Sequence, residues 1–166
     1  MPPIKNDFTE QQLAELVPSI RRYAYSLTGS MPDADDLLQT TLERLMTKSI
    51  PEGAVLAAWA FRICRNSWID EHRGRQVREN AVHEPSLQAA QSVDGEQDIH
   101  SQMTLDKVHQ AMAHLKDDQR AVVGLVAVEG LSYKEVAAVL EVPVGTVMSR
   151  LARARAALSA LLAGAY

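Results

Sequence analysis

The stretch "LSYKEVAAVLEVPVGTVMSRLARARAAL" at residues 131–158 decides the fold of the C-terminal part of the chain. Ser132, followed three residues later by Glu135, has the form of a capping box that starts a short helix. A turn at 141–143 follows, and apolar residues then recur at helical spacing along a second helix. These residues are Val147, Leu151, Ala154, Leu158 and Leu161. Two helices around so short a turn predict a helix-turn-helix.

The second of these helices has an unusual charge. From Val142 to the C-terminus there are three arginines and no acidic residue, although the whole chain has a formal net charge of −4. In a helix-turn-helix this helix enters the major groove, where an arginine can bind guanine O6 and N7 and the unpaired first-turn amides can bind an anion. The alternative is a solvated arginine face on an ordinary terminal helix. The candidate DNA-reading residues are Gly145, Thr146, Ser149, Arg150 and Arg153.

Three helices are predicted before residue 79. Together with the helix-turn-helix at the other end of the chain, they predict an all-α fold class. Thr9 and Gln12 form a capping box for the first, which should end at Gly29 and be kinked or divided by Pro18. The second should start at Asp33. The third helix is expected at 55–73, after a loop at 47–54.

The segment 79–106 carries six acidic residues and no lysine or arginine. It predicts a mobile acidic linker, or alternatively a solvated loop held against a domain. We therefore expect two small helical domains at 1–78 and 101–166, joined by a linker at 79–100.

Apolar spacing predicts a helix after the linker, and Asp117 is expected to cap the next one, "DQRAVVGLVAVEG". The valines of that segment alone would also allow a strand. Helical neighbours on both sides favour a helix. The residues that mark the helix before Asp117 are Leu105, Val108, Met112 and Leu115.

The third predicted helix combines basic and aromatic residues. This pattern suits single-stranded or unstacked bases, which stack on rings while cations hold the phosphates. The alternative is that Phe61 and Trp68 are core residues and the arginines are solvated. Asn66 could bond a base edge or a neighbouring helix. The candidate residues here are Trp59, Arg62, Arg65, Asn66 and Arg73.

The predicted helix from Asp33 has an acidic outer face formed by Asp36, Gln39 and Glu43. Such a face is complementary to a basic helical partner, although charged outer faces are common on helices.

Several function classes find no support in the sequence. The five histidines lack metal-ligand spacing, and no phosphate-binding loop or nucleophile motif is present. Cys64, the single cysteine, is expected to be a small core residue. No apolar run is long enough to span a membrane, and Met1 is not followed by a secretory signal. We expect a cytoplasmic protein without catalysis, metal or cofactor.

Three motifs together resemble one family. These are "DADDLLQTTLERLM" (33–46), "AWAFRICRNSWIDEHRGR" (58–75) and the 131–158 stretch quoted above. They are similar to conserved regions 2 and 4 of the extracytoplasmic-function (ECF) sigma factors of bacteria. The last motif alone would also fit response-regulator domains, but the three in order cover nearly the whole chain.

The resemblance implies partners and roles. It implies that the face with Asp36, Gln39 and Glu43 docks on core RNA polymerase. The segment with Arg62, Arg65 and Asn66, with the loop 47–54, would open the minus-10 promoter element, and the segment from Gly145 would read the minus-35 element. The linker would pass through the polymerase, and an anti-sigma factor would hold the protein inactive.

Some positions depart from the family pattern. Thr40 stands where an acid is usual, Glu141 where glycine is usual, and Met148 where lysine is frequent. The loop 47–54 lacks an aromatic residue. If position 141 needs a left-handed backbone, glutamate costs about 1 kcal/mol there.

Two other functions fit parts of the pattern. One is a helix-turn-helix regulator that binds duplex DNA without polymerase. The other is an adaptor that mimics a sigma factor and binds an anti-sigma factor.

Overall fold

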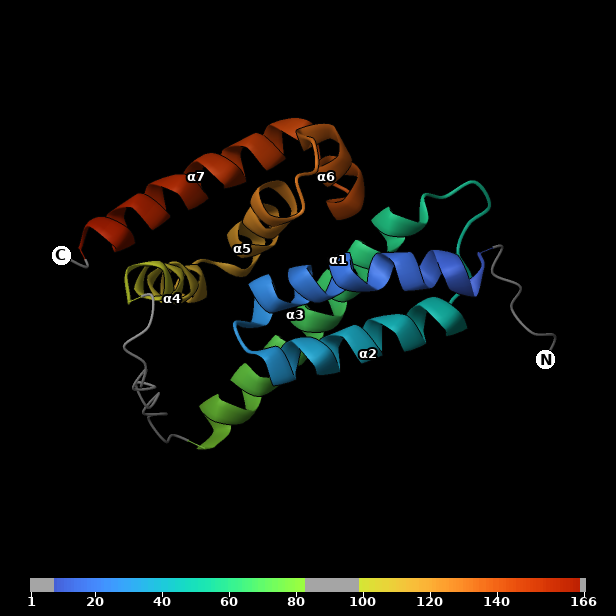
Figure 1. Cartoon of the computed structure of the whole chain (residues 1–166), viewed down its shortest axis with the longest axis horizontal. Coiled ribbons are helices and arrows are strands. Elements are labelled where there is room, and N and C mark those ends of the chain that lie inside the picture. Colours follow the sequence, from blue (N-terminus) through green and yellow to red (C-terminus); the bar gives the residue numbers. More distant parts are fainter. Residues whose placement is uncertain (1–7, 83–98, 165–166) are drawn as a thin grey trace.

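The computed structural model describes residues 8–82 and 99–164, and every regular element within them is helical (Figure 1). This confirms the predicted all-α class. The part of the expected linker at 83–98 lies outside the described residues. The elements are α1 (Glu10–Thr28), α2 (Met31–Thr47), α3 (Leu56–Val82), α4 (Ile99–Ala113), α5 (Asp117–Val123), the π-helical turn η1 (Gly124–Val128), α6 (Tyr133–Leu140) and α7 (Val144–Ala163).

Helix α1 begins and ends as predicted. The Thr9 hydroxyl accepts from the Gln12 amide, the Gln12 side chain accepts from the Thr9 amide, and Gly29 ends the helix with a φ of 72°. The prediction that Pro18 divides this helix is wrong, because α1 continues on both sides of it. Full burial of Ile20 and Leu27 after the proline holds the second part of α1 against the core.

Helix α2 begins two residues before the predicted Asp33. Ser30 is the N-cap and its hydroxyl accepts from the Asp33 amide, while Pro32 lies in the first turn, where a missing amide hydrogen costs little. Helix α3 starts one residue after the predicted boundary and extends nine residues beyond it, to Val82.

The prediction that Asp117 caps α5 is wrong. Lys116 is the N-cap residue, without a side-chain cap, and Asp117 is the first helical residue. The valine-rich segment is helical, as expected, and continues from α5 into η1.

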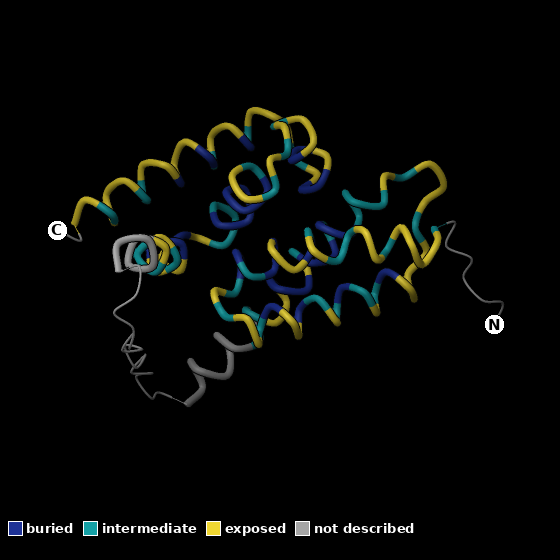
Figure 2. Tube along the Cα trace, viewed as in Figure 1, coloured by how far each residue is buried: buried dark blue, intermediate teal, exposed yellow. Residues whose placement is uncertain are grey.

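The helix-turn-helix consists of α6 and α7. The Ser132 hydroxyl accepts from the Glu135 amide at the start of α6. Glu141 ends this helix in a left-handed conformation, with φ 56° and ψ 45°. In α7 the predicted inner stripe is buried at its first three positions and half-buried at Leu158, but Leu161 is exposed. Figure 2 shows the outer side of α7 exposed.

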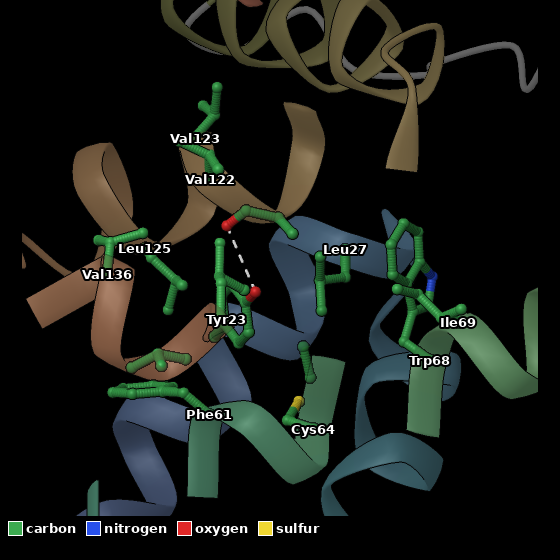
Figure 3. Packing of buried hydrophobic residues seen from close by; sticks show 14 of the residues in the cluster. Tyr23, Leu27, Phe61, Cys64, Trp68, Ile69, Val122, Val123, Leu125 and Val136 are labelled. Atoms are coloured by element: carbon green, nitrogen blue, oxygen red, sulfur yellow. Dashed lines mark hydrogen bonds between the residues drawn. The ribbon is translucent and has the colours of Figure 1, made fainter. Parts of the chain in front are cut away.

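The N-terminal helices and the C-terminal helices share one hydrophobic core (Figure 3). Helix α1 packs on α2 and α3, and it also contacts α4, α5 and η1, while α3 contacts α6. Tyr23 is fully buried at the centre, edge-on to Phe61 of α3, and its hydroxyl donates to the Ala121 carbonyl of α5. Gly124 fits directly against Tyr23 and Ser26. The two halves are therefore packed together in this arrangement.

Candidate nucleic-acid interface

The outer face of α7 carries the residues predicted to read duplex DNA. Gly145, Ser149 and Arg153 are exposed, and Thr146 and Arg150 are half-buried. The positions follow one another at intervals of about one helical turn, so they form one continuous stripe. The hydroxyl of the exposed Ser149 donates to the Gly145 carbonyl at 2.9 Å, and its oxygen retains lone pairs that can accept a hydrogen bond.

Arg150 has a partner within the same half of the protein. Its Nε lies 3.4 Å from Oδ2 of Asp118, on α5. This ion pair holds the guanidinium of one member of the stripe against α5. At the start of α7, Pro143 is the N-cap and offers no side-chain acceptor. No side chain therefore caps the first-turn amides of α7. Their N–H groups remain available to bind an anion.

Arg62, predicted to contact the minus-10 element, faces the helix-turn-helix instead of solvent. Its Nε donates to the Val139 carbonyl at 2.9 Å, its Nη2 donates to the Ala138 carbonyl, and its Nη1 lies 3.2 Å from the Glu141 carboxylate. The guanidinium also lies over the Trp59 ring, 4.7 Å from its centroid. Only 17% of the Arg62 side chain is exposed.

The other predicted minus-10 residues differ in accessibility. Asn66 is exposed and accepts a hydrogen bond from Arg65, whose Nε is buried without a partner in the described part of the chain. Trp59 is half-buried. The Arg73 side chain lies outside the described residues. Phe61 and Trp68 are buried in the core, as the alternative interpretation of this helix proposed.

The loop between α2 and α3 borders an open pocket of about 450 Å³. Its lining includes Ile50, Pro51 and Leu56, together with Phe8 and Gln12 from the N-terminal segment. Phe8 thus supplies the aromatic ring that the loop itself lacks. Sequence spacing could not indicate this, because Phe8 and the loop are separated by two helices.

The face predicted to bind polymerase is open to solvent. Asp36, Gln39 and Glu43 of α2 are all exposed and lie on one side of the helix. Thr40 is half-buried and its hydroxyl donates to the Asp36 carbonyl, so it adds no charge to this face.

Arg120 was not predicted from the sequence to have a role. It is 8% exposed, and its Nε donates to the Ser26 carbonyl in the last turn of α1 at 2.9 Å. Burial lowers the pKa of its guanidinium to about 10, and the Asp117 carboxylate partly counters this effect. The side chain therefore stays charged at neutral pH while it joins the two halves.

Burial raises the pKa of the Cys64 thiol to about 12, which leaves little thiolate at neutral pH. Within residues 8–82 and 99–164, no cluster of histidine, cysteine or acidic side chains is placed to hold a metal ion. No helix in that same part of the chain has the length and apolar character needed to cross a membrane.

Comparisons with known proteins agree with this layout. Family models for "Sigma-70 region 2" and "Sigma-70, region 4" match residues 13–78 and 105–158. The chain is 36% identical over 158 residues to the ECF RNA polymerase sigma factor EcfG of Rhodopseudomonas palustris, covering 94% of this chain and 86% of that protein. The chain belongs to the ECF RNA polymerase sigma factors. Residues 13–78 therefore correspond to sigma region 2, and residues 105–158 correspond to sigma region 4.

Solved structures show the same arrangement of helices. The sigma factor RpoE of Bartonella quintana, in complex with the anti-sigma factor NepR, matches with a TM-score of 0.70 at 34% identity, covering 92% of this chain and 95% of that one. CnrH, in complex with the cytosolic domain of CnrY, matches with a TM-score of 0.68 at 28% identity, covering 93% and 86%. The family resemblance stated from the sequence motifs is confirmed.

Proposed function

We propose that this sigma factor binds core RNA polymerase through the acidic face of α2 and reads promoters with two separate surfaces. Region 4 would read the minus-35 element as duplex, through the stripe from Gly145 to Arg153. Region 2 would bind the opened minus-10 element through α3, with Arg62, Arg65 and Asn66 as contacts. The observation that carries the proposal is the presence of both family regions in order, with α3 in the first and α7 in the second.

The division of labour follows from the chemistry of the two elements. Duplex readout needs a helix that fits a groove, which α7 provides. Melting needs groups that hold bases already out of the stack. Trp59 and Asn66 on α3 and the pocket beside Phe8 offer an aromatic ring, an amide and a recess for that purpose.

An anti-sigma factor is the expected inhibitor of this protein. Support comes from two similar sigma factors, whose structures were solved with NepR and with the cytosolic domain of CnrY. We place the protein in the cytoplasm, where polymerase and promoter DNA are found, and assign it a regulatory role without catalysis.

Complex formation with purified core polymerase distinguishes this function from its rivals. The sigma factor should elute with the core at a one-to-one ratio, and the complex should protect minus-10 and minus-35 segments of a promoter fragment. A stand-alone regulator would protect duplex DNA without core. A sigma-mimicking adaptor would bind an anti-sigma factor and protect no promoter.

A further inference from the structure

Two large apolar residues are exposed at the start of α7, the helix with the DNA-reading stripe. Val144 is the first residue of the helix and is 40% exposed, and Met148, one turn further along, is 53% exposed. Side chains four positions apart lie on the same side of a helix, so these two are neighbours. Neither belongs to the hydrophobic core that the two halves of the chain share. We call them the apolar pair of α7.

The surroundings of the apolar pair suit a polyanion. Three arginines and no acidic residue follow Val142, and two of them, Arg153 and Arg155, are exposed. The family pattern often has lysine at position 148, which would add one more contact to phosphate. Methionine gives up that charge and presents an apolar surface instead. In the major groove, the C5 methyl group of thymine is the apolar group that can meet it.

Small residues next to the apolar pair allow α7 to come close to the base edges. Gly145 and Ser149 directly follow the two members of the pair, and both are exposed. A Cβ built at Gly145 would meet nothing within 4 Å, so the space outside this turn is open. Ala152, one turn after Met148, is also exposed and small. Because these three positions carry no long side chain, the thioether of Met148 can reach the bases beyond the sugar-phosphate rim.

We propose that Val144 and Met148 read thymine in the minus-35 element by packing against its C5 methyl group. The inference rests on the proposed function, in which α7 binds this element as duplex. The N-terminal residues of the second helix of a helix-turn-helix face base edges, and both members of the pair lie in the first two turns of α7. The unbranched, polarisable side chain of Met148 can adapt its shape to a methyl group. The pair thus adds a base preference that hydrogen bonds from Arg150 and Arg153 do not supply.

Replacement of thymine by uracil tests the proposal, because the two bases differ only in the C5 methyl group. The probe is a promoter fragment that the wild-type holoenzyme, assembled from the full chain and core polymerase, selects from a genomic library. In a second version of the fragment, deoxyuridine replaces every thymidine of the minus-35 element on both strands. Competition between the two fragments is measured at one salt concentration. The wild-type holoenzyme should bind the thymine fragment about fourfold more tightly for each methyl group that the pair contacts.

Variants of α7 connect this preference to the apolar pair. The double variant Val144→Ala with Met148→Ala should bind both fragments equally, with the affinity that the wild-type holoenzyme has for the uracil fragment. Leu161→Ala is the control, since Leu161 is 37% exposed on the same helix but lies about 20 Å beyond Met148. It should keep the wild-type preference. Met148→Lys should lower the preference for thymine and increase the magnitude of the salt slope by about 0.9, because it adds a phosphate contact.

Equal binding of the wild-type holoenzyme to the two fragments would overturn the proposal, and so would a selected minus-35 element without thymine on either strand. A double variant that keeps the wild-type preference would overturn it too. If the double variant weakens both fragments by the same factor, the pair contacts polymerase or the DNA backbone and does not read thymine. All these results leave the proposed function intact. A wild-type holoenzyme that selects no promoter fragment would instead refute the proposed function, and the reading of thymine with it.

Discussion

Glu141 holds a left-handed backbone conformation, and its carboxylate lies 3.2 Å from Nη1 of Arg62 in the other half of the protein. Glycine adopts this conformation at no steric cost, whereas a residue with a Cβ loses about 1 kcal/mol or more. The family pattern favours glycine at this position. Glutamate at this position strains the backbone, but its carboxylate adds an ion pair between region 4 and region 2.

Glu141→Gly should therefore raise the free energy of unfolding by up to about 1 kcal/mol. The ion pair that is lost contributes little to stability, because the Glu141 side chain is 70% exposed. Glu141→Ala removes the same carboxylate but keeps the Cβ, so it should not gain this stability. Urea unfolding curves of both variants give the comparison. A Glu141→Gly protein no more stable than Glu141→Ala would refute the backbone argument.

Gly124→Ala should destabilise the protein by about 1–3 kcal/mol. The new Cβ would lie 2.7 Å from the Ser26 hydroxyl oxygen and 2.8 Å from a ring carbon of Tyr23, and both neighbours are buried. Gly145→Ala is the control, since a Cβ there meets nothing within 4 Å and α7 should gain about 0.5–1 kcal/mol. The urea midpoints of the two variants should move in opposite directions. A neutral Gly124→Ala would show that the core yields at this contact.

Glu129 should make the free energy of unfolding fall as the pH rises. Burial raises the pKa of its carboxyl above 4.5, and the hydrogen bond and charge of Arg22 only partly oppose this. The folded protein then holds the proton more tightly than the unfolded chain, so stability is fully present at low pH and falls as pH rises through the raised pKa. Unfolding by urea at a series of pH values from about 4 to 7 measures the fall. Glu129→Gln should remove it, and an unchanged pH profile would contradict the assignment.

Asp36→Arg should weaken association with core polymerase by about 1–2 kcal/mol, because it reverses a charge on the exposed face of α2. Glu15→Arg makes the same change at an exposed position of α1 and serves as the control. Competition against a labelled wild-type chain for limiting core polymerase measures both. If the two variants compete equally well, the α2 face is not the polymerase contact.

Arg150→Ala should lower discrimination between minus-35 and scrambled duplexes by about 1–3 kcal/mol while leaving core binding intact. Arg155 is exposed on the same helix but lies outside the stripe. Arg155→Ala should weaken binding to both duplexes equally, and by less than Arg150→Ala weakens binding to the minus-35 duplex. Binding to the two duplexes at one fixed salt concentration tests this. If Arg150→Ala loses the same binding free energy on both duplexes, Arg150 contacts only phosphate.

Much of the fold could be predicted because local signals set it. The Thr9 capping box, the Ser132 cap and the inner stripe of α7 as far as Leu158 depend on residues three or four positions apart, and each is present in the structure. Predictions from single residues were weaker. Lys116, and not Asp117, is the N-cap residue of α5. Pro18 did not divide α1, because the buried residues Ile20 and Leu27 hold the part of the helix after it against the core.

The contacts between the halves could not be predicted. Periodicity shows which face of a helix is apolar, but not which distant element covers it. Sequence alone therefore does not distinguish Arg62 and Arg120 from solvated arginines. Their carbonyl partners belong to helices more than seventy residues away along the chain. The family resemblance assigned Arg62 to DNA, and the structure adds that region 4 occupies it in the packed arrangement.

Under the proposed function, this sigma factor directs polymerase to promoters by binding two elements at once. Run-off transcription with purified core polymerase on a genomic DNA library, followed by sequencing of the RNA 5′ ends, tests it most directly. Start sites should fall at a limited set of positions that share a minus-10 and a minus-35 sequence at fixed spacing. Start sites scattered without a shared sequence, or the same sites with core polymerase alone, would contradict the claim.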